Sequence, residues 1–203
     1  MIHATLIDTA TLHAHLDDPG WIVVDCRFSL MDTAAGRRAY AEGHLPGARY
    51  AHLDEDLSSP ITLASGRHPL PDPARLTQRL GEWGIGNNTQ VVAYDDAGGM
   101  LAAARLWWLL RWLGHTACAV LDGGIVAWRQ AGLPLTAESP AVQPARFEAR
   151  SNDRLWLTTA QVQALTTTEL LLDARAAARY RGEMEPIDPV AGHIPGAANL
   201  PTE

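Results

Sequence analysis

The sequence predicts an α/β fold in which helices cover both faces of a parallel sheet. Short apolar runs alternate with amphipathic stretches, which is the pattern of strands joined by helices. The apolar runs lack polar alternation, as expected for strands buried on both faces. These runs are Trp21–Asp25, Gln90–Tyr94 and Cys118–Leu121. A pair of motifs also recurs along the chain, which predicts tandem domains.

The helix boundaries follow from capping signals. Residues 5–9 predict a short strand that leads into a helix capped by Asp or Thr. Residues 73–83 predict a helix in which Asp72 is the N-cap and Pro73 takes the first helical position. Gly84 follows its last turn. Three independent signals therefore define this helix.

Two further helices are predicted beyond the second apolar run. Residues 100–113 predict a largely buried helix, because apolar side chains occupy most of its turns. Residues 125–131 predict a shorter helix that ends before Gly132, and Pro134 prevents its continuation. Both helices lie next to predicted strands, as in a sheet covered on its two faces.

The alternation breaks at residues 135–151, where Pro140 and Pro144 lie among small and polar residues. Such a composition is typical of a linker. We therefore expect a first domain over residues 1–138, a linker over residues 139–153, and the start of a second domain over residues 154–203.

The second domain repeats the first but is incomplete. Asp25-Cys26-Arg27 precedes a Gly-His-Leu-Pro-Gly-Ala turn at residues 43–48. Asp173-Ala174-Arg175 precedes a matching turn at residues 192–197, about 149 residues later. Residues 155–159 and 170–173 likewise restate the first two strands of the first copy. Because most elements of the second copy are missing, we expect the natural product to continue beyond Glu203.

The bulk composition excludes several classes of protein. Apolar residues make up 47% of the chain and charged residues 19%, which suits a folded core. The net charge of -7 opposes binding to nucleic acid. The most apolar window, residues 100–113, is too short to span a membrane, and no signal peptide is recognisable. Two distant cysteines suggest neither a disulfide framework nor a metal site, which favours the cytoplasm. The oligomeric state stays open.

The motifs resemble those of the rhodanese sulfurtransferases. The likeness rests on the two motifs described above, repeated in both copies, and on Leu121-Asp122-Gly123-Gly124 with Trp128 in the first. Residues 65–71 and 185–189 further resemble the two-domain thiosulfate or mercaptopyruvate sulfurtransferases. The resemblance implies tandem rhodanese-like domains and no cofactor. It also implies transfer of sulfane sulfur from a small anionic donor to a thiol or cyanide acceptor through a cysteine persulfide.

The resemblance places no catalytic residue within this chain. Asp95 stands where the active domain of the family has its cysteine, and a carboxylate cannot carry a persulfide. The first domain is therefore expected to be catalytically silent. The equivalent cysteine of the second domain would lie beyond Glu203, so the 203-residue chain is expected to be inactive.

Arg179 is the one substrate-binding residue that the resemblance implies. It matches a family arginine that contacts the anionic donor, and a guanidinium suits a sulfonate or carboxylate. A solvated arginine on a helix is the equally weighted alternative. Ile187 stands where mercaptopyruvate-specific relatives can carry a second arginine, so the donor preference stays open with a tilt toward thiosulfate.

Other polar residues are predicted to be structural. Asp25 with Arg27 and Asp173 with Arg175 are interpreted as ion pairs that tie a strand end to a loop, since both copies contain them. His44 and His193 are expected to bond to the backbone within their turns. No catalytic role is expected for these residues, because the copy that is expected to be silent contains them too.

The remaining candidates are the cysteines and one loop. Cys26 and Cys118 are interpreted as small apolar residues within strands. Arg67 and His68 are left open, because family members place a loop of the first domain against the active cleft. A non-catalytic binding or regulatory module remains the alternative to a sulfurtransferase.

Overall fold

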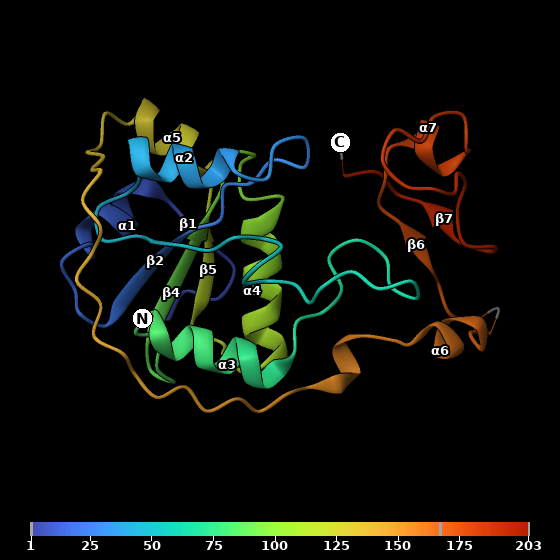
Figure 1. Ribbon diagram of the computed structural model, residues 1–203, viewed down its shortest axis with the longest axis horizontal. Helices are drawn as coiled ribbons and strands as arrows, with labels where there is room; N and C mark the ends of the chain where they lie inside the picture. Colours follow the sequence, from blue (N-terminus) through green and yellow to red (C-terminus); the bar gives the residue numbers. More distant parts are fainter. Residues whose placement is uncertain (1, 167, 203) are drawn as a thin grey trace. The chain divides into compact units, whose positions relative to one another are not determined.

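The computed structural model describes residues 2–166 and 168–202 (Figure 1). The chain divides into two compact units, Met1–Leu155 and Trp156–Glu203, which we call unit 1 and unit 2.

Unit 1 contains a five-stranded parallel sheet, as the sequence predicts. Its strands are β1 (Leu6–Ile7), β2 (Trp21–Asp25), β3 (Arg49–Tyr50), β4 (Gln90–Tyr94) and β5 (Cys118–Leu121), in the spatial order β1-β5-β4-β2-β3. β2 and β4 pair over their whole length, from Trp21 opposite Gln90 to Asp25 opposite Tyr94. The carboxyl ends of the two central strands therefore meet at one edge of the sheet.

Helices cover both faces of this sheet, which confirms the predicted fold class. They are α1 (Thr9–Ala14), α2 (Ala35–Glu42), α3 (Pro73–Glu82), α4 (Ala102–Trp112) and α5 (Gly124–Gln130). One apolar cluster joins α3 and α4 to one face, and a second joins α1 and α5 to the other (Figure 1). In β2, Ile22 and Val24 belong to the first cluster and Val23 to the second. Each fully buried leucine in these clusters contributes about 2 kcal/mol.

The capping signals locate α3 correctly, whereas α4 begins later than predicted. The Asp72 side chain accepts a hydrogen bond from the Arg75 amide at 2.8 Å, and Gly84 adopts a φ of 85° beyond the last turn. Helix α4 begins at Ala102 rather than at residue 100. Leu101 is the N-cap residue, because its backbone, with φ of -109° and ψ of -113°, is not helical, and its amide donates to Asp95 as an amide at a helix start can.

Residues 137–152 contain no helix or strand, and they run along unit 1. The Ala145 amide donates to the Gly81 carbonyl of α3 at 2.9 Å, and the Arg150 amide donates to the Leu113 carbonyl at 2.9 Å. Phe147 is buried against the apolar cluster of α3 and α4. We call this segment the strap, because these bonds hold it to the ends of two helices.

Unit 2 contains a two-stranded parallel sheet and two short helices. After the turn η1 (Asp153–Leu155) at the end of unit 1 come α6 (Thr159–Gln163), β6 (Leu172–Asp173), α7 (Ala177–Tyr180) and β7 (Ala198–Asn199). Helix α6 begins with a capping box formed by Thr158 and Gln161. Large apolar side chains of unit 2 are exposed, among them Leu157, Leu170, Leu172 and Ile194.

Residues 155–159 are expected to form a short strand that leads into a capped helix. The helix cap is confirmed at Thr158, whereas no strand forms over residues 155–157, so that part of the prediction is wrong. In unit 1 the corresponding β1 obtains its hydrogen bonds from β5, with Leu6 opposite Val120. The described residues of unit 2 contain no counterpart of β5. A strand pattern without a partner strand therefore remains irregular.

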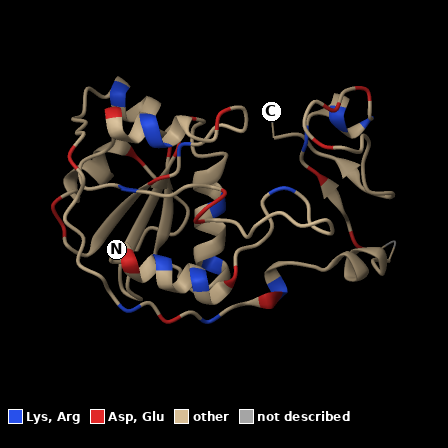
Figure 2. Cartoon of the chain, in the orientation of Figure 1, with Lys and Arg blue, Asp and Glu red and all other residues tan. Residues whose placement is uncertain are grey.

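Across the described ranges, no helix combines the length and apolar character needed to cross a bilayer. Figure 2 shows acidic and basic residues interspersed along the ribbon of unit 1.

Candidate functional site

The Asp95 carboxylate, directly after β4, is one of the buried polar groups of unit 1 that backbone amides hold in place. Oδ1 accepts hydrogen bonds from the amides of Ala97 and Gly99 at 2.9 and 2.7 Å. Oδ2 accepts from Leu101 and Ala103 at 3.1 and 3.2 Å. Asp95 is 1% exposed, so these four bonds offset the cost of burying its charge. We call the four amides the amide cradle.

Glycines give the amide cradle its close packing. Gly99 has a φ of 91°, and a Cβ atom there would lie 2.3 Å from Cγ1 of Val120. At Gly124, with a φ of 57°, a Cβ atom would lie 2.3 Å from the Asp95 carbonyl oxygen. A side chain at either position would push the loop away from β5, because backbone and core atoms cannot yield.

A cavity of about 680 Å³ opens beside the amide cradle, at the carboxyl ends of β2 and β4. Its charged lining consists of Arg67, His68, Asp95, Asp96 and Arg105. Apolar lining comes from residues such as Phe28, Leu53 and Leu101. Crevices at the carboxyl ends of parallel strands are the usual location of ligand sites in α/β sheets.

Arg105 of α4 fastens the loop that contains Arg67 and His68 to this cavity. Its Nε donates to the Leu57 carbonyl at 3.0 Å, and Nη2 donates to the carbonyls of His68 and Pro69 at 2.9 and 3.1 Å. Burial lowers the pKa of Arg105. No sequence pattern indicates this role, because the three acceptors are backbone groups far away along the chain.

His68 lies at the rim of the cavity in an unusual conformation. It has a φ of 51°, and its Nε2 lies 3.1 Å from Oδ1 of Asp54. Burial lowers the pKa of His68, and it outweighs the opposite effect of Asp54. The role of Arg67 and His68 could not be decided from the sequence, and both residues line the cavity of unit 1.

Neither cysteine has the surroundings of a nucleophile. Cys26 and Cys118 are both buried in the apolar cluster of α3 and α4. Burial, and then the nearby charges of Asp25 and Asp95, raise the pKa of Cys26 well above its usual range. Burial raises the pKa of Cys118 to about 12. The structure therefore agrees with their interpretation as small apolar residues.

The predicted ion pair of the first copy is present and buried. Nε and Nη2 of Arg27 donate to the two carboxylate oxygens of Asp25 at 3.0 and 2.6 Å, and Nη2 also donates to the Gly43 carbonyl at 2.8 Å. The Tyr94 hydroxyl donates to Asp25 Oδ2 at 2.6 Å, a contact that the sequence did not reveal. The pair thus joins β2, β4 and the turn, as interpreted.

The histidines of the two turns also have the predicted structural role. His44 Nδ1 lies 2.7 Å from the Tyr40 carbonyl oxygen, and its ring stacks on that of Tyr40. His193 Nδ1 lies 2.7 Å from the Tyr180 carbonyl oxygen, with the same stacking. Both rings are thus held by backbone carbonyls and ring stacking, and His44 Nε2 also lies 3.2 Å from the carbonyl oxygen of Glu138.

In unit 2, Arg179 lies among carboxylates. Its Nε and Nη2 donate to Glu185 at 3.2 and 2.7 Å, and Nη2 also donates to Oδ2 of Asp188 at 2.9 Å. Arg179 is therefore not a free solvated side chain. The partners follow it by six and nine residues, a spacing that no sequence rule assigns to ion pairs.

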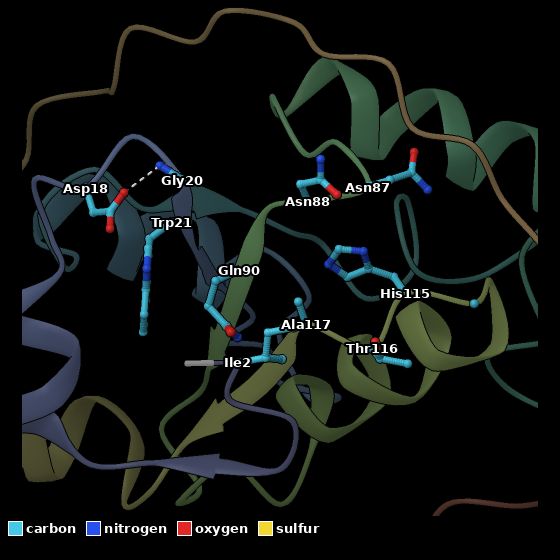
Figure 3. A pocket seen from close by; sticks show the side chains of 11 residues that line it. Ile2, Asp18, Gly20, Trp21, Asn87, Asn88, Gln90, His115, Thr116 and Ala117 are labelled. Carbon is cyan, nitrogen blue, oxygen red and sulfur yellow. Dashed lines mark hydrogen bonds between the residues drawn. The ribbon is translucent and has the colours of Figure 1, made fainter.

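A smaller cavity, of about 430 Å³, lies at the opposite end of the sheet (Figure 3). Gln90, Asn87 and His115 line it, and each bonds to a backbone group of the protein. These three side chains already have hydrogen-bond partners within the protein. The described residues contain no cluster of three or more potential metal ligands.

Comparison with known proteins agrees with this architecture. The model of the rhodanese-like domain matches residues 8–131. The probable 3-mercaptopyruvate sulfurtransferase of Pseudomonas aeruginosa is 49% identical over 201 residues, covering 97% of this chain and 70% of that protein. The putative thiosulfate sulfurtransferase SseB of Mycobacterium tuberculosis is 41% identical, covering 89% of this chain and 64% of that protein.

Solved structures give the same result. The 3-mercaptopyruvate sulfurtransferase from Leishmania major is 30% identical with a TM-score of 0.84, over 98% of this chain and 54% of that chain. SseA from Escherichia coli, described as a 3-mercaptopyruvate sulfotransferase, is 29% identical with a TM-score of 0.84, over 98% and 75% of the two chains. With a family match over more than half of its length, and a parallel sheet covered on both faces, this chain belongs to the rhodanese family.

Proposed function

We propose that this chain is part of a sulfurtransferase that moves sulfane sulfur from thiosulfate or mercaptopyruvate to a thiol or cyanide acceptor. The observation that carries the proposal is the 49% identity to a probable 3-mercaptopyruvate sulfurtransferase along almost the whole chain. We place this activity in the cytoplasm, with residues 1–138 and the residues from 154 onward as two rhodanese-like domains.

The proposed chemistry uses a cysteine thiolate that lies beyond Glu203. The thiolate attacks the outer sulfur of thiosulfate or the thiol sulfur of mercaptopyruvate and forms the S–S bond of the persulfide. The S–S bond of thiosulfate breaks and sulfite leaves, whereas the C–S bond of mercaptopyruvate breaks and the enolate of pyruvate leaves, which takes up a proton to become pyruvate. The acceptor then attacks the outer sulfur of the persulfide and regenerates the thiolate. This chain spans 70% and 64% of two curated relatives, which contain further residues that can supply such a cysteine.

Unit 1 is proposed to be catalytically silent. Asp95 fills the amide cradle with a carboxylate, which forms no persulfide. At a separation of about 4 Å, it would also repel an anionic donor by roughly 4 kcal/mol at an effective dielectric constant near 20. The buried thiols of Cys26 and Cys118 offer no substitute, because burial disfavours their thiolates.

Arg179 is proposed to bind the anionic donor in unit 2. Its guanidinium can hold a sulfonate or carboxylate through two parallel hydrogen bonds. The surrounding carboxylates keep it ordered in the absence of donor. Ile187 lies between Glu185 and Asp188, the two carboxylate partners of Arg179. It adds no positive charge there, so thiosulfate remains the slightly favoured donor.

The test compares turnover of the longer protein with that of the 203-residue chain, measured as thiocyanate formed from cyanide with thiosulfate, and as pyruvate formed from mercaptopyruvate. The longer protein should be active and the short chain inactive. In the longer protein, Arg179→Gln should raise KM for the donor. Arg181→Gln is the matched control, because Arg181 pairs with Glu183 nearby. Turnover of the short chain that is lost in Cys26→Ser or Cys118→Ser would contradict the proposal.

A non-catalytic binding or regulatory module is the second candidate, and the occupied amide cradle of unit 1 favours it. The intact mass of the protein from native cells separates the two functions. A mass of 22.0 kDa, equal to that of this chain, would favour the module. A larger mass, from a chain whose additional residues include a cysteine directly after a strand, would favour the enzyme.

A further inference from the structure

The guanidinium of Arg179 has two edges that can each hold an oxyanion, and different carboxylates lie at them. Glu185 takes the edge formed by Nε and Nη2, at 3.2 and 2.7 Å. Asp188 takes the second hydrogen of Nη2, at 2.9 Å, and so lies toward the edge formed by Nη2 and Nη1. An oxyanion that binds arginine through two parallel bonds needs one complete edge.

Glu185 is a fixed part of this cluster. Its side chain is 5% exposed, and its Oε1 also accepts hydrogen bonds from the amides of Ile187 and Asp188 at 3.1 and 3.0 Å. Nη1 of Arg175 lies 3.4 Å from Oε2. The bond to Arg179, followed by the backbone amides, lowers the pKa of Glu185. An incoming anion cannot displace this carboxylate without breaking all these contacts.

Asp188 is placed differently. Its side chain is 31% exposed, and it lies on the turn between Pro186 and Pro189. Water can therefore solvate its carboxylate if it leaves Arg179, which makes displacement much less costly than for Glu185. Displacement of Asp188 would free the second edge of the guanidinium for an external oxyanion.

The charge of the cluster points the same way. The guanidinium groups of Arg175 and Arg179 meet the carboxylates of Asp173, Glu185 and Asp188, so negative charge is in excess. An anion added to the complete cluster would meet net repulsion. A monoanion that replaces Asp188 at the guanidinium leaves the charge in contact with the two arginines unchanged, and a dianion adds one negative charge rather than two.

We propose that Asp188 is a displaceable counter-anion of Arg179, which competes with the anionic sulfur donor for one edge of the guanidinium and so sets donor affinity and selectivity. This inference rests on the proposed role of Arg179 in donor binding. Removal of the Asp188 charge should strengthen binding of every anionic donor. The gain should be larger for the thiosulfate dianion than for a monoanionic carboxylate, because the repulsion grows with the charge of the ligand.

Binding to the 203-residue chain tests the proposal without turnover. Thiosulfate and pyruvate are the probes, and the readout is the side-chain Nε–H signal of Arg179 in ¹H–¹⁵N spectra, assigned with Arg179→Lys. Asp188→Asn should bind thiosulfate about fivefold more tightly than the unchanged chain, with a smaller gain for pyruvate. Glu183→Gln is the control, since it removes the same charge from a pair of exposed residues nearby.

Asp188→Ser serves as a second variant, and the dispersion of the amide signals shows that each variant is folded. Equal thiosulfate affinity in Asp188→Asn, Asp188→Ser and Glu183→Gln would overturn the proposal. Absence of binding to the Asp188 variants would also overturn it, because the edge should then be open. Binding that persists in Arg179→Gln, read from shifts of the backbone amide signals around Arg175 and Glu185, would instead refute the donor role of Arg179, while the turnover assay tests the sulfurtransferase activity independently.

Discussion

The two units contain the same local motif with almost the same internal bonds. In unit 1 the Arg27 guanidinium lies 3.0 and 2.6 Å from the oxygens of Asp25, and in unit 2 Arg175 lies 3.0 and 2.6 Å from those of Asp173. Each arginine also donates to the glycine carbonyl that begins the following turn. The internal geometry of the motif is therefore determined by nearby residues.

Burial of the motif is where the units differ. The side chains of Arg27 and Asp25 are 4% and 0% exposed, whereas those of Arg175 and Asp173 are 29% and 12% exposed. In unit 1, β4 pairs with β2 along its whole length, and its Tyr94 hydroxyl donates to Asp25. In the described part of unit 2, β6 pairs with β7 alone. Burial thus depends on strands that are distant in sequence.

The largest expected effect is on the buried ion pair. Asp25→Ala leaves the Arg27 charge buried without its partner, so the free energy of unfolding of unit 1 should fall by about 3–5 kcal/mol. Asp173→Ala should have a much smaller effect on unit 2, because water solvates Arg175. Urea denaturation followed by hydrogen exchange and mass spectrometry reports on each unit. Equal losses in both units would break the comparison.

The next effect concerns the stability of the whole units. Amides of β4 should exchange at least about a hundredfold more slowly than those of β6, since a two-stranded sheet buries little area. Native-state hydrogen exchange on the 203-residue chain measures both sets at once. Uniform protection across the units would show that unit 2 gains stability from elsewhere.

Much of this contrast could be predicted from local patterns. The apolar runs of β2, β4 and β5 and the capping residues of α3 each determine their element over a few residues. The failed strand at residues 155–157 has an equally good local pattern, but a strand also needs a partner. Pairing partners are non-local, so the sequence pattern predicted this strand where none forms.

The site shows the same division between local and distant information. The bond between Arg27 and Asp25 follows from a separation of two residues, which the motif displays directly. The contacts of Arg105 with backbone carbonyls, and of Arg179 with Glu185 and Asp188, depend on how loops fold back. No pattern of residue types encodes a loop path, so these contacts were found only in the structure.

A moderate effect is expected at the amide cradle. Asp95→Ala removes the acceptor from four amides, so the free energy of unfolding of unit 1 should fall by about 2–3 kcal/mol. Asp96→Ala is the matched control, because that neighbouring carboxylate is exposed. Urea denaturation followed by tryptophan fluorescence is the measurement. Equal stability of the two variants would mean that water satisfies the amides as well as Asp95 does.

The smallest expected signal is the reactivity of the thiols. Because burial raises the pKa of Cys118 to about 12, its thiolate should remain scarce in the folded chain between pH 7 and 9, and Cys26 should behave likewise. Iodoacetamide should label neither cysteine in the native chain and both in urea. In the unfolded chain the labelling rate should rise with pH toward the ordinary thiol pKa of 9.0. Native labelling at pH 8, checked by peptide mass, would contradict the buried assignment.

The amide cradle is built from backbone groups and glycines, and the side chain at its centre only has to be an anion of modest size. The fold of this loop therefore depends on the direction of its amides and on the absence of side chains at its glycines, and much less on the chemical identity of the small anion that they surround.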